Sequence, residues 1–531
     1  MVFKGKLSRG CESCRKLHTK CDEKRPACSR CVRTKRSCTG YRDELDLMFR
    51  RADVKSKERS RKSGTKNHEQ LSLVVGSKPS HDYTMMRARE ESQFLLSGSH
   101  GRALPPSKEY LALCFFYQTT LEPLIDADHI QYLHLQLPTL FSQCGADSAL
   151  HLATQAISLA VWAKSRPNDM DARHLSRTRY LQSLSAMKAA IRDAVKVKSD
   201  ETLYTVLLLS GYETITFDSE ALPAWGAHID GATALVSHRG RENFCTPFAC
   251  NMFLFIRRNT IQSQSQISEP IDKIFDEFAE ILSPYENVED RLLSKTMHIP
   301  KLQSLANSLI SRPTYAVDVN EVFELIQAAE DIDRELVNWA RQIPINWSHT
   351  TVTRMAPQLS RSTFIPIQIH RYPHFYAARV WNSYRVHRLI IQSILFRVSS
   401  CMYLSTDYRQ GRTEKINRVM VDDVCASVPF LLGYDLSELK RSADNLQDEN
   451  FLWPQSMMTK AGISGHTGKF SLIWPLYIAC SVPSIPETQR RWMRAQLGWI
   501  AETGVAQAQS VLDAESQTLM GGPESFRFDC V

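Results

Sequence analysis

The chain has 531 residues, of which 43% are hydrophobic and 23% are charged, and 65 lysines and arginines against 57 aspartates and glutamates give a net charge of +8. This length is enough to bury a large core. The amino-terminal residues lack the apolar segment of a secretory signal, and no run of residues approaches the roughly 18 apolar positions of a membrane-spanning helix. The composition therefore excludes a membrane-spanning protein and predicts a soluble one.

The first 38 residues contain six cysteines with the spacing C-x2-C-x6-C-x6-C-x2-C-x6-C. The second three follow the first three at a constant shift of 17 positions, so the two halves offer the same set of thiols. Structural zinc takes four ligands in a tetrahedron at about 2.3 Å from sulfur. Six thiolates therefore complete two zinc sites only if two of the sulfurs are shared.

The symmetry of the repeat predicts that the shared sulfurs belong to the first cysteine of each half. The predicted ligands are Cys11 and Cys28 as bridges between two Zn²⁺ ions, Cys14 and Cys21 on one ion, and Cys31 and Cys38 on the other. A disulfide framework and a metal store are the alternatives for so many cysteines in a short stretch. A disulfide framework would be expected in a secreted protein, and the sequence shows no sign of secretion. A metal store would not need the basic residues that lie between the cysteines here.

Positive charge is concentrated around the cysteines. From Met1 to Lys66 there are 21 lysines and arginines against 8 aspartates and glutamates, a net charge of +13, whereas the whole chain carries only +8. A basic run can also be a solvated tail or a localisation signal. Because this one is attached to a rigid metal core, it predicts binding to the phosphate backbone of a nucleic acid.

Two stretches, GCESCRK at residues 10–16 and KCDEKRPAC at residues 20–28, resemble the fungal zinc binuclear cluster (Zn2Cys6) transcription factors. The resemblance implies a small metal-stabilised module of two short helices with two Zn²⁺ per chain. It also implies a nuclear, sequence-specific regulator of RNA polymerase II genes. Its expected partners are double-stranded DNA and the transcription machinery or co-regulators. A membrane partner is not expected because apolar runs are short, and enzyme activity is not expected because HExxH, GxSxG and GxGxxG motifs are absent.

In this family the first helix reads a CGG-type triplet in the major groove, mainly through a lysine and backbone carbonyls that lie between the second and third cysteines. Here Leu17 and His18 replace the usual basic pair. A lysine offers more donors to guanine than a neutral imidazole does. We expect His18 to touch a base edge, with Lys16 or backbone carbonyls as the alternative readers. The residues expected to contact phosphates are Arg15, Lys20, Arg33, Lys35 and Arg36.

Residues 1–41 are predicted to form the zinc module, and residues 42–106 a basic, largely disordered linker that carries a nuclear import signal. Family members that bind DNA as dimers place a coiled coil in the linker, which requires apolar positions over three or four heptads. The apolar residues at 45–49 occupy about one turn and do not continue. Dimerisation through this linker is therefore not predicted, and the choice between monomer and dimer stays open.

Residues 107–531 are predicted to form a large all-α regulatory domain. Apolar residues from Val322 to Ala340 follow the helical period, and Asp318 with Glu321 resembles a capping box at the start of that helix. A second long helix is expected over 377–395. Strand-like alternation occurs only at 364–369, where Pro366 argues against a strand.

Residues 199–240, with WGAHIDGA at 225–232, look like the fungal-specific transcription factor domain, as do WNSYR at 381–385 and WPLYIA at 474–479. This second resemblance implies a regulatory role for the helical domain. Gly240 is placed to end a helix. His228 is either a ligand-sensing residue or a hydrogen-bonded core residue, and the second interpretation is favoured.

Residues 462–470 are the nearest approach to a phosphate-binding loop. Five residues instead of four separate Gly462 and Gly468, and Phe470 follows the lysine where a serine or threonine is required. The eight cysteines outside the cluster are scattered and are expected to stay reduced. Two classes of function remain: a sequence-specific DNA-binding regulator, which is favoured, and a helical enzyme or ligand-binding protein that the zinc module tethers to nucleic acid.

Overall fold

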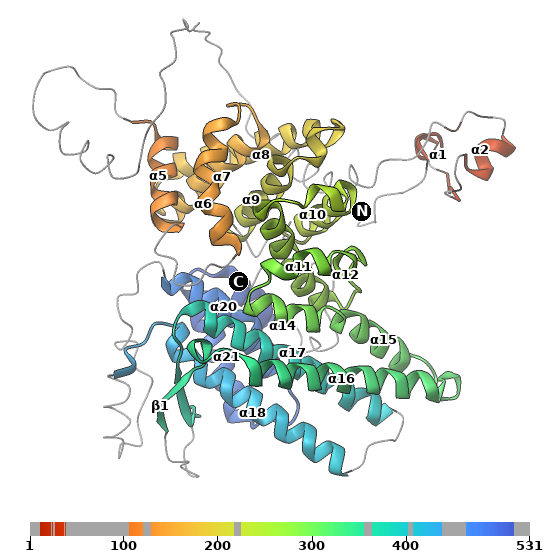
Figure 1. The fold of residues 1–531 in the computed structure, drawn as a ribbon, viewed down its shortest axis with the longest axis vertical. Coiled ribbons are helices and arrows are strands. Elements are labelled where there is room, and N and C mark those ends of the chain that lie inside the picture. Colours follow the sequence, from red (N-terminus) through yellow and green to blue (C-terminus); the bar gives the residue numbers. More distant parts are fainter. Residues whose placement is uncertain are drawn as a thin grey trace, which may run out of the picture.

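The structure is a computed structural model that describes residues 11–17, 19–22, 24, 27–34, 36, 38, 106–120, 129–216, 225–354, 364–401, 407–437 and 464–513. Within these ranges the chain forms a small two-helix module near its amino terminus and a large, mostly helical domain (Figure 1). The predicted combination of a metal-type module with a helical domain is confirmed. Except for Pro106, the predicted linker lies outside the described residues.

The first part of the helical domain encloses one hydrophobic core, here called the first core. Its larger buried members include Tyr204, Phe244, Phe253 and Phe275. The helices of this part are α5 (Lys108–Thr120), α6 (His129–Gln143), α7 (Ala149–Ser165), α8 (Met170–Arg192), α9 (Asp200–Ile215), α10 (Trp225–Arg239), α11 (Pro247–Ile267), α12 (Ile274–Glu277) and α13 (Ala279–Leu282).

Side-chain caps determine where several of these helices begin. The hydroxyl of Ser148 accepts a hydrogen bond from the N–H of His151 at the start of α7, and Asp169, Ser199 and Thr246 act in the same way at α8, α9 and α11. Each cap satisfies an N–H group that has no partner within its own helix.

The rest of the domain surrounds the second core, which includes Leu336, Ile391, Val424, Leu476 and Leu497. Its elements are α14 (Val288–Thr296), α15 (Ile299–Ser311), α16 (Val319–Gln342), β1 (Thr350–Arg354), β2 (Gln368–Arg371), α17 (Phe375–Cys401), α18 (Asp407–Leu431), α20 (Ser464–Cys480), α21 (Glu487–Glu502) and α22 (Ala506–Asp513). Figure 1 shows the two parts one above the other. Helix α14 joins them, because Leu292 packs in the second core and Leu293 in the first.

The helix predicted after Asp318 is confirmed as α16, but the predicted capping box at its start is only half formed. Asp318 caps it by accepting a hydrogen bond of 2.9 Å from the N–H of Asn320. Glu321 does not complete a capping box. Its carboxylate instead pairs with Arg312 Nη1 at 2.8 Å. The predicted apolar stripe is buried, including Val322, Leu325, Ala329 and Leu336.

The expectation that residues 364–369 are not part of a strand is partly wrong. Strand β2 begins at Gln368, two residues after Pro366, and pairs antiparallel with β1, so that Thr351 lies opposite His370. Pro366 has no N–H to donate to a ladder, and the strand starts only beyond it. The domain is therefore mostly helical rather than strictly all-α.

Two glycines are required by their surroundings. Gly240 follows α10 with φ of +76°, and a Cβ there would lie 2.6 Å from the Glu242 carboxylate, which confirms that this glycine ends the helix. Gly468 lies within α20, where a Cβ would come within 1.9 Å of the backbone oxygen of Leu431. From Ser464 onward, the segment that resembled a phosphate-binding loop thus forms the start of a tightly packed helix.

His228 is a core residue of α10, with 2% of its surface exposed. Its Nε2 lies 3.3 Å from the hydroxyl of Tyr180, and burial lowers its pKa to about 4. An imidazole in this position is neutral at physiological pH. The structure supports the interpretation of His228 as a hydrogen-bonded core residue.

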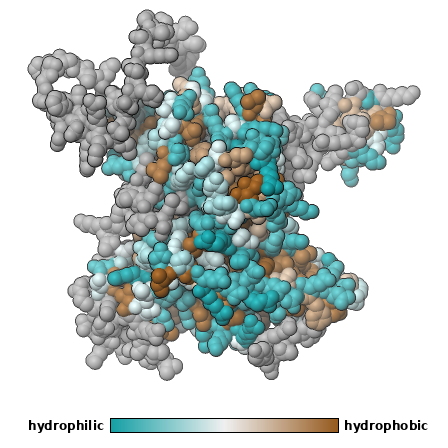
Figure 2. Space-filling model, viewed as in Figure 1, coloured by the Kyte–Doolittle hydropathy of each residue, from teal (hydrophilic) through white to brown (hydrophobic). Residues whose placement is uncertain are grey.

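Apolar side chains on the face shown in Figure 2 form small, separate groups on a mainly hydrophilic surface. In the described part of the chain, none of the helices combines the length and the apolar character that a membrane span requires.

A buried group of charged and polar residues ties α14 to the first part of the domain. Asp290 Oδ2 lies 2.6 Å from His129 Nε2 of α6, and Asp290 Oδ1 lies 3.4 Å from Arg257 Nη2 of α11. Arg257 is fully buried and also pairs with Glu286 at 2.8 Å. Burial alone would raise the pKa of Asp290, but the hydrogen bond and charge of His129 together with Arg257 hold it below its ordinary value.

Replacing Asp290 with alanine is expected to destabilise the helical domain by about 3 kcal/mol, because Arg257 and His129 would lose a buried partner. Urea unfolding of the full chain, followed by circular dichroism, measures this loss. Glu335→Ala is the control, since Glu335 forms an exposed pair with Lys295 at 2.6 Å and should cost less than about 1 kcal/mol. Equal losses in the two variants would contradict a structural role for the buried group.

Candidate metal centre and nucleic-acid interface

The first cysteine of each half precedes a short helix: Cys11 precedes α1 (Glu12–Lys16), and Cys28 precedes α2 (Ser29–Arg33). The N–H of Cys14 donates to Cys11 Sγ at 3.4 Å, and the N–H of Cys31 donates to Cys28 Sγ at 3.3 Å. The leading sulfur thus caps its helix, as a serine or aspartate oxygen does elsewhere. The C-x2-C spacing places the second thiol on the first turn, beside the first thiol.

The two halves also share a backbone hydrogen bond at the end of each helix. The N–H of Thr19 donates to the carbonyl of Cys14 at 2.9 Å, and the N–H of Arg36 donates to that of Cys31 at 2.9 Å. These two positions are related by the same 17-residue shift as the cysteines. In the first half, the chain then brings Cys21 Sγ within 3.4 Å of the N–H of Cys11.

The six sulfurs form two overlapping groups of four, within each of which the sulfurs lie within 4.8 Å of one another. The groups are Cys11, Cys14, Cys21 and Cys28, and Cys11, Cys28, Cys31 and Cys38. The two shared sulfurs, of Cys11 and Cys28, are 3.7 Å apart. A disulfide would bring two sulfurs to about 2.05 Å, and all six cysteines are free. The disulfide alternative is therefore wrong.

The spacing of the sulfurs fits zinc. Tetrahedral zinc with sulfur at about 2.3 Å holds its sulfurs about 3.8 Å apart, and the pairs Cys11–Cys28, Cys11–Cys31 and Cys14–Cys28 are each separated by 3.7 Å. Burial raises the pKa of the Cys11 thiol, so a group of thiolates here needs nearby cations. Bound Zn²⁺ supplies that charge and keeps the thiols deprotonated.

Asp22 positions the second helix, a role that the sequence did not reveal. Its carboxylate accepts a hydrogen bond of 3.0 Å from the N–H of Ser29, the first residue of α2. The hydrogen bond with Ser29 is also the main reason why the pKa of Asp22 lies below its ordinary value. This contact links the segment after Cys21 to the start of the second half.

Four of the residues predicted to contact DNA have described, exposed side chains: Lys16, Lys20, Arg33 and Arg36. Arg15 lies in α1, but its side chain is outside the described part, as are His18 and Lys35 as a whole. Two further cations, Lys24 and Arg30, are exposed on the module and were not predicted. Leu17, in the expected reading segment, is 51% exposed, and Lys16 and Lys20 on either side of it are exposed as well.

Comparison with known families agrees with this geometry. Residues 9–47 match the fungal Zn(2)-Cys(6) binuclear cluster domain, and residues 128–513 match the fungal-specific transcription factor domain. The second match alone covers well over half of the chain. The chain belongs to the fungal Zn2Cys6 transcription factors, and it is a transcription regulator with a zinc-cluster DNA-binding domain.

Curated relatives include the transcription factor dbaG of Emericella nidulans, which is 31% identical over 218 residues. That alignment covers 39% of this chain and 48% of the relative, so the chain matches about half of the relative's length. White-opaque regulator 2 of Candida albicans is 48% identical over 42 residues, which are 8% of this chain and 9% of that protein. No solved structure gives a significant match.

Proposed function

We propose that the module binds two Zn²⁺ per chain, with Cys11 and Cys28 as bridging ligands. Cys14 and Cys21 complete one site, and Cys31 and Cys38 complete the other. The proposal is supported by the two overlapping four-sulfur groups that have only Cys11 and Cys28 in common. Two separate four-sulfur sites would need eight cysteines, and the module has six.

Cys28→Ala is expected to release both zinc ions, because it removes a ligand from each site. Cys38→Ala is the matched control, since the other group of four sulfurs stays complete and should retain one ion. Native mass spectrometry of the purified proteins counts the bound zinc. A Cys28→Ala protein that keeps two tightly bound ions would exclude the bridging assignment.

We also propose that the module docks in the major groove of double-stranded DNA on a CGG-like triplet. Arg15, Lys20, Arg33, Lys35 and Arg36 contact phosphates, and Lys16 and His18 lie near the bases. The observation that supports this role is the compact sulfur centre surrounded by exposed cations, including Lys16, Lys20, Arg33 and Arg36. Family membership supports a nuclear location and action on RNA polymerase II genes.

DNA affinity is expected to fall steeply with salt. With roughly six phosphate contacts, a plot of log K against log salt concentration should have a slope of about −5. Fluorescence anisotropy with a labelled duplex, measured from low to physiological salt, gives this slope. A flat dependence would contradict docking through the phosphate backbone.

His18→Lys is expected to shift the preferred site toward the CGG triplet of the family, because a lysine donates to both O6 and N7 of guanine. Random-site selection with the original chain and the variant measures the shift, and Lys24→Arg serves as a control that keeps the charge of an exposed position. If the original chain and the His18→Lys variant select the same sites, His18 does not read a base.

We propose that the chain is organised as a DNA-binding module at 1–41, a basic linker at 42–106 and a regulatory domain at 107–531. In this division the helical domain binds co-regulators or the transcription machinery, or pairs with a second copy, and performs no catalysis. Two results together would contradict this division: the chain shows no DNA sequence preference, and an enzymatic activity remains after deletion of residues 1–66.

A further inference from the structure

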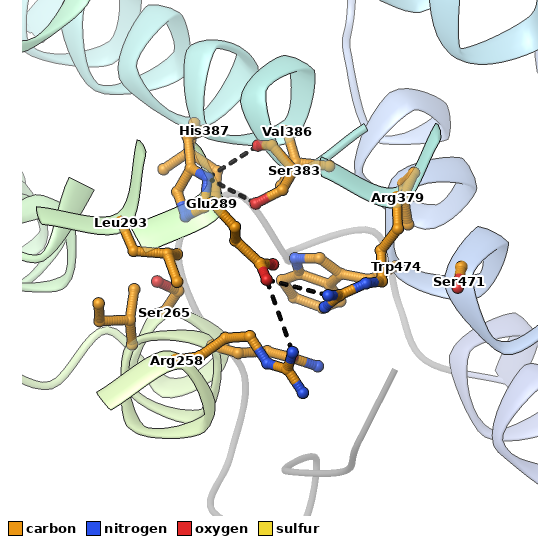
Figure 3. A pocket seen from close by; sticks show the side chains of 14 residues that line it. Arg258, Ser265, Glu289, Leu293, Arg379, Ser383, Val386, His387, Ser471 and Trp474 are labelled. Atoms are coloured by element: carbon orange, nitrogen blue, oxygen red, sulfur yellow. Dashed lines mark hydrogen bonds and ion pairs between the residues drawn. The ribbon is translucent and has the colours of Figure 1, made fainter. Parts of the chain in front are cut away.

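A small cavity of about 70 Å³ lies where the two cores of the helical domain meet (Figure 3). Helix α11 of the first core forms one wall, while α17 and α20 of the second core form the others, together with α14. A site for one water molecule needs only about 10 to 15 Å³ of such space. The cavity therefore has room for a small organic molecule.

One face of α11 supplies hydrogen-bond donors to this cavity. Arg258, Gln262 and Ser265 follow one another at the spacing of successive helical turns and all line it. Ser265 is 2% exposed, and its hydroxyl has no hydrogen-bond partner among the described residues. The same holds for the buried amide nitrogen of Gln262. Unsatisfied buried donors are unfavourable, and a ligand that accepts hydrogen bonds relieves them.

The charges at the cavity also favour an acceptor. Glu289 is the single carboxylate among the lining residues, and it pairs with Arg379 at 2.9 Å and with Arg258 at 3.6 Å. Figure 3 shows Glu289 between the two guanidinium groups. Because two guanidinium groups face one carboxylate, the lining carries a net positive charge, which favours an anionic ligand.

His387, on the α17 wall, adds no positive charge. Its Nδ1 lies 2.7 Å from the backbone oxygen of Ser383, so this nitrogen carries the proton and donates. Burial lowers the pKa of His387 to about 4, and the ring is neutral at physiological pH.

The remaining walls are largely apolar. The apolar lining residues are Ile261, Leu293, Val386, Ile390, Trp474 and Pro475. An inorganic anion would leave this surface without a partner, whereas a ligand with a short hydrocarbon part would cover it.

We propose that this cavity binds a short aliphatic carboxylate. The carboxylate oxygens accept hydrogen bonds from Gln262 and Ser265 beside the positive charge of Arg258, and the hydrocarbon part packs against Trp474 and the aliphatic side chains. Such a ligand contacts helices of both cores at once and therefore stabilises their association, which gives the regulatory domain a means of responding to a small metabolite.

Isothermal titration of the full, zinc-loaded chain with acetate, propionate, butyrate and hexanoate tests this proposal. We expect at least one of these acids to bind with Kd below about 10 mM, and the alcohol of the same chain length and inorganic phosphate to bind at least about ten-fold more weakly. The absence of carboxylate binding, or equal binding of the alcohol or of phosphate, would overturn it.

Gln262→Leu removes the amide while keeping the size of the side chain, and it is expected to weaken binding of the tightest carboxylate about ten-fold or more. Gln264→Leu makes the same change on the same helix outside the cavity lining and should leave the Kd within about two-fold. Thermal unfolding shows that each variant is folded, and Ser265→Ala replaces Gln262→Leu if the latter is not. Unchanged affinity in the folded variant that lacks the donor would contradict the proposed site.

Discussion

The zinc module depends on its sulfurs for its fold, because its buried core among the described residues consists of cysteines. Cys11, Cys14, Cys28 and Cys31 are buried, and Cys21 and Cys38 pack against them. A domain of this size cannot bury enough apolar surface to fold by itself, so metal binding supplies much of its folding free energy. The positions of both helices, and of the exposed cations on them, follow from the coordination of the sulfurs.

The helical domain is stabilised in a different way, by two hydrophobic cores that meet at α14. The first turn of this helix carries Glu289, which faces the cavity and Arg379, and Asp290, which pairs with His129 and Arg257. One short stretch of backbone therefore connects the proposed ligand site with the buried ionic group that attaches α14 to the first core. This arrangement suits a domain that passes a binding event from one half to the other.

The cysteine cluster could be predicted from the sequence because its six cysteines lie close together in the chain and their repeat is visible without a structure. Helix α16 was predictable from its apolar period for the same reason. Contacts that depend on the tertiary fold could not be predicted: strand β2 depends on pairing with β1, and Asp22 accepts a hydrogen bond from the N–H of Ser29, which lies in the other half of the module. The cavity requires α11, α14, α17 and α20 to converge, which no local pattern indicates.

The central claim is that a zinc-organised module reads a specific DNA sequence. Random-site selection with the full chain, carried out on the zinc-loaded protein and again after removal of zinc by a chelator, tests it most directly. The account predicts enrichment of a specific short site for the zinc-loaded protein and no enrichment after chelation. Enrichment that persists without zinc, or no preferred site with zinc bound, would contradict it.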